Sequence, residues 1–178
     1  MDVPGGSVRV KSDDQDASFD GLIKPLLGEA YGLAYSMLHD RGAAEDAVQE
    51  AAIKAWRGIG NLRRGASSRS WFFAIVANQC RDARRSREHR VIGLDNVTEA
   101  LHVDHAERVI HDLDLERALA SLSPEQAALL FLRFHLDLPP SQIAGVLRWR
   151  VGTVKSRLHR TLRKLEIEMA PSPMENSR

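Results

Sequence analysis

The sequence predicts an all-α protein. Apolar residues recur at steps of three and four in successive segments from Phe19 onwards, which is the helical period. Gly, Pro and Ser separate these segments, as expected for helix ends. Near the C-terminus two short helical patterns meet across a three-residue joint, which is typical of a helix-turn-helix. A chain of 178 residues suits one or two small domains.

Composition limits the class of protein. The chain is 43% hydrophobic and 28% charged, so it can bury a core and remain soluble, and its net charge of +1 says little about partners. The single cysteine, Cys80, excludes an intramolecular disulfide and fits a reducing compartment. Since no N-terminal apolar leader and no membrane-length apolar run is found, we expect a cytoplasmic protein without membrane insertion.

The N-terminal part begins with a polar stretch, residues 1–17, which we expect to be a disordered tail. A helical pattern follows from Phe19 to Leu38, and Pro25 should start or kink that helix. The next predicted helix, residues 43–57, has a buried face of small residues and an outer face on which four side chains share one side at i, i+3, i+4 and i+7: Asp46, Gln49, Glu50 and Ile53. This face could dock on a basic partner helix, or the acidic residues could simply favour the helix dipole; the pattern alone favours the second.

A basic segment follows. Residues 58–69 should be a loop, and Ser70 should cap a helix from Trp71 whose first turns are aromatic and whose later turns are basic. Aromatic rings beside arginines suit single-stranded nucleic acid, because bases stack on rings while arginines follow phosphates. The alternative is that the aromatics are core, which we favour for Phe73 and Ile75, while Trp71 and the loop arginines stay open.

Residues 91–112 lack periodicity and are predicted to be a linker. Its histidines, His102, His105 and His111, lack the i, i+4 spacing of a zinc helix, so we predict no metal site and no cofactor. No phosphate-binding glycine loop or nucleophile motif occurs, so we expect a non-enzymatic protein without a small-molecule substrate.

The C-terminal part is helical again from Leu113. Ser123 and Pro124 form a strong helix start, residues 137–140 form a turn, and Ser141 should cap the first helix of the helix-turn-helix. From Arg148 to Lys164 there are seven Lys or Arg and no Asp or Glu. Such a helix can enter a DNA major groove and donate to bases and phosphates, although a solvated basic face is the alternative.

Three motifs in this order resemble the extracytoplasmic-function group of bacterial sigma-70 factors. They are Asp46-Ala47-Val48-Gln49-Glu50; Trp71 to Asn78 with Asp82 and Arg85; and Leu122 to Gln126 running into Gln142-Ile143-Ala144 and Gly152 to Arg157. The resemblance implies two small helical domains joined by a flexible linker: sigma region 2 at residues 18–90, a linker at 91–112, sigma region 4 at 113–168, and a C-terminal tail at 169–178.

The resemblance also implies roles. The Asp46 face, with Gln49, Glu50 and Ile53, would bind the beta-prime clamp helices of RNA polymerase core, and region 4 would contact the beta flap. The residues implied for the −10 element are Arg63, Arg64, Trp71, Asn78, Arg81, Arg84 and Arg85. Those implied for the −35 element are Arg150, Thr153, Lys155, Ser156, Arg157, His159 and Arg160. The resemblance further implies promoter-directed initiation, an anti-sigma partner and association with the nucleoid when bound to polymerase.

The joint departs from the family pattern, which usually has Gly at position 148 and Ser or Pro at 150. Because Arg148 lacks the conformational freedom of Gly, we expect either a differently shaped turn or capping by Thr153, while Arg150 could add a DNA contact. Ala47 and Ala52 replace the larger apolar residues usual in the family, which implies weaker core binding.

Two other classes compete with a sigma factor. An ordinary helix-turn-helix repressor or activator would not need the acidic face or the aromatic basic loop. A sigma mimic that only binds an anti-sigma factor would not need a fully basic helix.

Overall fold

The computed structural model describes residues 7–62, 65–92, 119 and 121–169, and every regular element in this part is helical. The α-helices are α1 (Ser7–Leu22), α2 (Leu27–Leu38), α3 (Arg41–Gly58), α4 (Ser68–Ile92), α6 (Pro124–Leu130), α7 (Pro140–Leu147) and α8 (Val151–Glu168). Three short elements complete them: the 3-10 turns η1 (Lys24–Leu26) and η2 (Ile59–Asn61), and the π-helical turn η3 (Phe131–His135). The predicted linker histidines lie outside the described residues.

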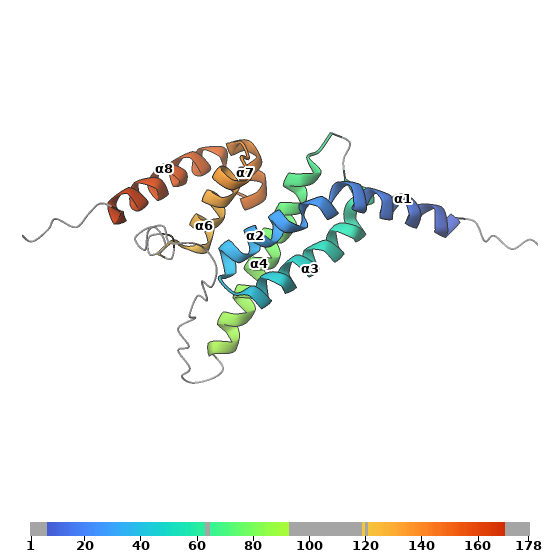
Figure 1. Cartoon of the computed structure of the whole chain (residues 1–178), viewed down its shortest axis with the longest axis horizontal. Coiled ribbons are helices and arrows are strands. Elements are labelled where there is room, and N and C mark those ends of the chain that lie inside the picture. Colours follow the sequence, from blue (N-terminus) through green and yellow to red (C-terminus); the bar gives the residue numbers. More distant parts are fainter. Residues whose placement is uncertain (1–6, 63–64, 93–118, 120, 170–178) are drawn as a thin grey trace, which may run out of the picture.

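Helices α2, α3 and α4 form the N-terminal bundle (Figure 1). Helix α3 contributes four alanines and one valine to the core, and these small side chains let α2 and α4 approach closely. Helix α4 contributes larger side chains to this core, since Phe72, Phe73 and Val76 are fully buried. The core residues of the bundle are Ala30, Leu33, Ala34, Met37, Ala44, Ala47, Val48, Ala51, Ala55, Phe72, Phe73, Val76, Ala77 and Cys80.

The expectation of a disordered tail over residues 1–17 is wrong from Ser7 onwards, because α1 begins there. Tertiary contacts explain the difference. The side chains of Gln15 and Asp16 bond to Trp56 of α3, with Trp56 Nε1 donating to the Asp16 carboxylate at 2.7 Å. Pro25 lies in η1 and α2 starts two residues later, so the helix begins near Pro25, which is one of the two predicted outcomes.

Asp40 fixes the beginning of α3. Its carboxylate accepts from the Ala43 backbone N–H at 2.9 Å and from Arg87 of α4 at 3.1 Å. The hydrogen bond from Ala43 and the nearby Arg87 lower the pKa of Asp40, against the opposing effect of burial. This one side chain therefore caps α3 and ties it to α4.

Helix α4 starts earlier than predicted, at Ser68 rather than Trp71. Ser67 acts as the cap, because its hydroxyl accepts from the Ser70 backbone N–H at 3.2 Å. Ser70, the predicted cap, lies inside the helix and donates to Gln142 of α7 at 3.0 Å. A cap three residues upstream could not be distinguished by sequence, since Ser67, Ser68 and Ser70 all suit the role.

The C-terminal part packs α6, η3, α7 and α8 together. Ser123 caps α6 as predicted, and Gln126 completes a capping box by accepting from the Ser123 N–H at 2.9 Å. Ser141, in contrast, does not cap α7. That helix begins at Pro140 with Pro139 before it, so Ser141 lies inside the helix, where the Gln142 N–H donates to the Pro139 carbonyl at 2.9 Å.

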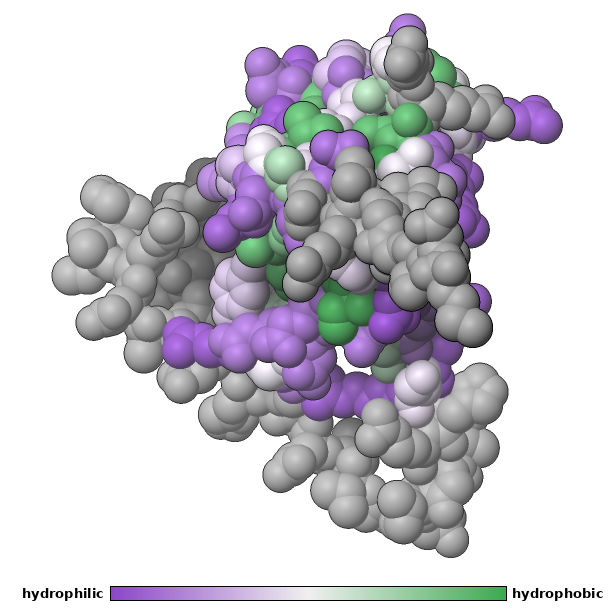
Figure 2. Space-filling model, turned by 90° about the vertical axis from the view of Figure 1, so that its right-hand side faces the viewer, coloured by the Kyte–Doolittle hydropathy of each residue, from purple (hydrophilic) through white to green (hydrophobic). Residues whose placement is uncertain are grey.

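The two helical domains pack against each other and share one continuous core (Figure 1). Helices α2 and α4 contact α6 and α7 across this junction. Large apolar side chains that stay exposed include Ile53, Phe134 and Ile167. Figure 2 shows one face of the molecule, on which small hydrophobic areas stand between hydrophilic side chains. Among the described helices none has the length and apolar composition that would cross a membrane.

Candidate nucleic-acid interfaces

Helices α7 and α8 form the helix-turn-helix predicted from sequence. Helix α7 is amphipathic with four buried side chains, Ile143, Ala144, Val146 and Leu147, and α8 packs on it through Val154. Thr161 of α8 is also buried. Leu158, Leu162 and Leu165 are half-buried, so a narrow apolar stripe sets the position of α8 while most of its polar side chains stay exposed.

The joint keeps the left-handed turn although it has no glycine. Arg148 adopts φ 58° and ψ 42°, and backbone N–H groups of Arg148 and Trp149 donate to the Ala144 carbonyl, the latter at 2.9 Å. The expected change of turn shape is therefore wrong. The alternative of capping by Thr153 is also wrong, because α8 begins at Val151 with Arg150 in the N-cap position and no side-chain cap. The first N–H groups of α8 thus have no side-chain partner and, with the helix dipole, favour contact with a phosphate.

Every side chain predicted for the −35 element lies on the outer side of the joint and of α8. Arg150, Lys155, Ser156, Arg157, His159 and Arg160 are exposed, and Thr153 is half-buried. Ser156 Oγ donates to the Thr153 carbonyl at 3.1 Å, and Arg160 Nε donates to the Ser156 carbonyl at 3.3 Å. Within the described residues no carboxylate pairs with these groups, so their donors can turn to an external acceptor.

One residue of this surface was missed by sequence analysis. The guanidinium carbon of Arg157 lies 4.2 Å from the centroid of the Trp149 ring, in a cation–π arrangement. Trp149 itself is half-buried against the core. The sequence offers one indication of this contact, because Trp149 lies two residues before a basic helix. Only the geometry of the turn places its ring beside Arg157 in the second turn of α8.

The basic face of α4 carries the described residues predicted for the −10 element. Arg81 Nη1 donates to Asn78 at 3.0 Å, Arg85 pairs with Asp82, and Arg84 pairs with Glu88 of its own helix at 3.6 Å. Arg63 and Arg64 lie outside the described residues.

Trp71 is half-buried against the core, with its six-membered ring next to Gly58, where an added Cβ would stand 3.3 Å from Cζ2. The structure therefore gives Trp71 a packing role, and Phe73 is core as favoured from sequence.

Several of these groups also contact the C-terminal domain. Arg81 Nη2 donates to the Leu147 carbonyl at 3.2 Å, and Arg84 lies 3.6 Å from the Glu125 carboxylate. Burial lowers the pKa of Arg81, and the positive charges of Arg148 and Arg85 act in the same direction while Glu125 opposes them. The α4 face is thus partly occupied in this structure.

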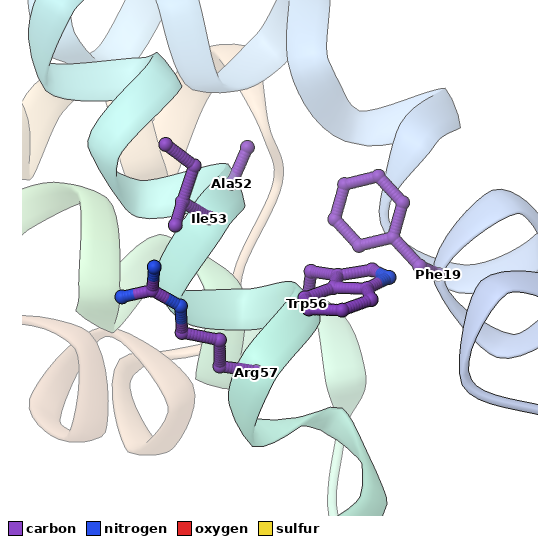
Figure 3. Close-up of a pocket in the computed structure, with 5 residues that line it drawn as sticks. All are labelled: Phe19, Ala52, Ile53, Trp56 and Arg57. Atoms are coloured by element: carbon purple, nitrogen blue, oxygen red, sulfur yellow. The ribbon is translucent and has the colours of Figure 1, made fainter. Parts of the chain in front are cut away.

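The acidic face of α3 is open. Asp46, Gln49, Glu50 and Ile53 are all exposed, and within the described residues the three polar side chains form no hydrogen bond or ion pair. Next to this face lies an open cavity of about 400 Å³, lined by Phe19, Ala52, Ile53, Trp56 and Arg57 (Figure 3). An apolar hollow beside carboxylates suits a partner that is basic with an apolar contact at its centre.

A metal or thiol site finds no support in the described part of the chain. No group of three His, Cys, Asp or Glu side chains in it could hold an ion. Burial raises the pKa of the Cys80 thiol to about 12, which keeps it protonated and unreactive at neutral pH.

Comparison with known proteins agrees with this geometry. The sigma-70 region 2 family matches residues 22–90, and the sigma-70 region 4 family matches residues 112–165. The ECF RNA polymerase sigma factor SigL of Mycobacterium tuberculosis is 34% identical over 143 residues, which cover 76% of this chain and 80% of SigL. The RNA polymerase sigma factor SigV of Bacillus subtilis is 30% identical over 78% of this chain and 83% of its own length.

Among solved structures, the sigma factor RpoE from Bartonella quintana, in complex with the anti-sigma factor NepR, aligns with a TM-score of 0.73 and 26% identity. The alignment covers 84% of this chain and 95% of RpoE.

Proposed function

Since the chain belongs to the extracytoplasmic-function group of sigma-70 factors, we propose that its exposed surfaces carry out promoter-directed initiation in the following way. Helix α8 binds the −35 element, the α4 face binds the −10 element, and the acidic face of α3 holds RNA polymerase core. Sigma factors are transcription initiation factors rather than enzymes, and the proposal needs no catalytic group in this chain.

The observation that carries the proposal is the outer surface of α8. Lys155, Arg157 and Arg160 are exposed on one helix that begins without a side-chain cap, and none of the three pairs with a carboxylate of the described residues. An α-helix fits the major groove, where Lys and Arg donate to guanine O6 and N7 and Ser156 donates or accepts. Uncapped N–H groups at the start of α8 and the charge of Arg150 add sequence-independent phosphate contacts that set the register.

Trp149 has a positioning role in this scheme. An arginine that stacks on a half-buried ring loses less rotamer freedom when it binds DNA than a freely rotating one. Arg157 would therefore reach the groove from a nearly fixed position, because part of its side-chain entropy is already lost when the protein folds.

The α4 face suits a melted −10 strand. Asn78 and Arg81 are already joined by a hydrogen bond, which presents an amide and a guanidinium side by side. Arg84 and Arg85 extend the positive charge along the same helix, so phosphates can follow it.

The α3 surface suits the polymerase. Asp46 and Glu50 have exposed carboxylates that can pair with basic side chains. Ile53 and the neighbouring apolar hollow can form the water-free centre of an interface. Ala52 lines that hollow. The sequence analysis associated this small residue with weaker core binding, but in this position it leaves space for a side chain of the partner.

An anti-sigma factor is a further proposed partner. The support is the RpoE likeness, which covers both domains of this chain and comes from a complex with an anti-sigma factor. No residue of this chain is assigned to that contact.

The test is transcription in vitro with purified core polymerase on a library of promoter templates. Initiation that requires both core and this chain supports the proposal, and loss of initiation on scrambling either element assigns the two DNA surfaces. Tight, specific duplex binding without core would support a repressor instead. No gain in initiation on any template would refute the proposal.

A further inference from the structure

Two adjacent polar residues of α1 contact the C-terminal end of α3. Gln15 Nε2 donates to the backbone carbonyl of Trp56, which is one of the last carbonyls of α3 and has no partner inside the helix. The Asp16 carboxylate accepts from Trp56 Nε1 at 2.7 Å. These residues lie 41 and 40 positions away from Trp56 in sequence. The end of α1 therefore fixes both the backbone and the side chain of one residue of α3.

Trp56 also forms one wall of the apolar hollow beside the acidic face of α3. The hollow is lined by Phe19 of α1 and by Ala52, Ile53, Trp56 and Arg57 of α3. The rings of Phe19 and Trp56 turn toward the same space, while Ile53 and Arg57 lie one helical turn apart (Figure 3). The side chains of Ile53 and Trp56 are 43% and 39% exposed. The hollow is thus an uncovered apolar surface with a wall from each of two helices.

The hydrogen bond from Trp56 to Asp16 keeps this hollow open. Long side chains of a helix lean over the preceding turn, so a free indole at position 56 would lie on Ala52, four residues earlier. Covering Ala52 would remove apolar surface from water, which is favourable. The indole N–H is the only hydrogen-bond donor of the ring, and its bond to a carboxylate is charge-assisted. This bond therefore holds the ring on the α1 side of the hollow.

The hollow is continuous with the surface proposed to bind polymerase core. Ile53 lines the hollow and also belongs to the acidic face of α3. A partner of that face needs basic groups for the carboxylates and an apolar group for the centre of the contact. Arg57, at the edge of the hollow, favours an acidic group on the same partner. Charges of both signs around one apolar space can fix how the partner is placed along α3.

We propose that Asp16 is a positioning residue for the binding of polymerase core, because it holds the Trp56 indole so that the hollow can receive one apolar side chain of the partner. The inference rests on the proposed function for the assignment of the α3 face. It goes beyond that assignment, since it makes the polar helix α1 part of the surface that determines affinity. Asp16 acts through Trp56 and needs no contact of its own with the polymerase.

The first test measures the Kd of the full chain for purified core polymerase. In Asp16→Ala the indole must be ordered and moved off Ala52 during binding, so we expect Kd to rise roughly three- to tenfold. Asp16→Asn keeps an acceptor oxygen for the indole N–H without the charge, and should restore most of the affinity. Asp20→Ala is the matched control, because it removes the same charge from α1 at an exposed ion pair with Lys24 at 3.4 Å. Its Kd should equal that of the unsubstituted chain.

The second test asks whether Asp16 acts through the indole. Trp56→Phe keeps a ring but removes the N–H, so adding Asp16→Ala to it should cause no further loss of core affinity. In a chain labelled with fluorotryptophan, the Trp56 resonance is the one that disappears in Trp56→Phe. That resonance should shift in Asp16→Ala and stay in place in Asp20→Ala, while the resonances of Trp71 and Trp149 stay in place in both. A general loss of stability would not give this pattern.

The outcomes separate this inference from the proposed function. If Asp46→Ala with Gln49→Ala weakens core binding and Asp16→Ala does not, the inference is overturned and the role of the α3 face stands. An Asp16→Asn chain that binds as weakly as Asp16→Ala also overturns it, since the charge of Asp16 would then act directly on the partner. Dimerisation of the free chain that Asp16→Ala weakens, measured by ultracentrifugation, would assign the hollow to a second copy instead. If none of these variants changes core affinity, the proposed role of the α3 face fails together with the inference.

Discussion

Removing the ring under Arg157 tests how the −35 surface is organised. In Trp149→Leu the apolar packing of the joint is largely kept, but the guanidinium at 4.2 Å loses its aromatic platform. A cation–π pair at an exposed site contributes about 0.5–1 kcal/mol, which corresponds to roughly a two- to fivefold change in an equilibrium constant. We therefore expect the preference for an intact over a scrambled −35 element to fall by about that factor.

The assay is run-off transcription on paired templates that differ only in the −35 element, at subsaturating concentrations of this chain. Trp149→Phe keeps a smaller aromatic face and should lose less than Trp149→Leu. Combining either change with Arg157→Ala gives a double-mutant cycle, in which the loss from Trp149→Leu should largely disappear once Arg157 is absent. Additive losses would refute the idea that Trp149 acts through Arg157, and equal melting temperatures would exclude a folding defect.

Four other variants test the remaining surfaces, the cap of α3 and the turn at Arg148. Asp46→Ala with Gln49→Ala should weaken co-purification with core polymerase without changing the melting temperature, because both side chains are exposed and make no internal bond among the described residues; native-like recovery of core would reject that face. Arg160→Ala should reduce −35 dependence by about 1–3 kcal/mol in run-off assays if the side chain bonds a base, and leave core affinity intact. Asp40→Ala should cost about 1 kcal/mol of unfolding free energy by urea titration at neutral pH. Since the folded-state pKa of Asp40 is lowered, that difference is present above the unfolded pKa near 4 and shrinks as pH falls through the folded value; a pH-independent difference would contradict the cap. Arg148→Gly should raise stability by up to about 1 kcal/mol, because Arg148 holds φ 58°; a loss in urea midpoint would indicate a contact that outweighs the strain.

Local sequence determined the parts of the fold that need only neighbours along the chain. Ser123 and Pro124 start a helix because a hydroxyl and a missing N–H act within one turn. The outer face of α3 follows from period alone, so Asp46 and Glu50 lie exposed together as predicted. The helix-turn-helix was predicted in the same way, and its turn tolerates Arg148 because the hydrogen bonds to Ala144 hold the left-handed conformation.

Tertiary contacts decided the remainder. Helix α1 extends into a polar stretch because Trp56, forty residues away in sequence, bonds to Asp16. Ser70 lies inside α4, which Ser67 caps, and its hydroxyl instead donates to Gln142 of the other domain. Neither partner is predictable from spacing, since both depend on which helix faces meet.

The sequence by itself determined that two cationic helices and one acidic helix exist and which side chains they expose. Only the tertiary structure decided that the two domains close on each other, with Phe131 seated on Gly32 and Arg81 bonded to a carbonyl at the end of α7. The physical reason is that charge and periodicity are properties of single helices. The space left by the missing Cβ of Gly32, in contrast, matters for packing only because the ring of Phe131 from another helix fills it.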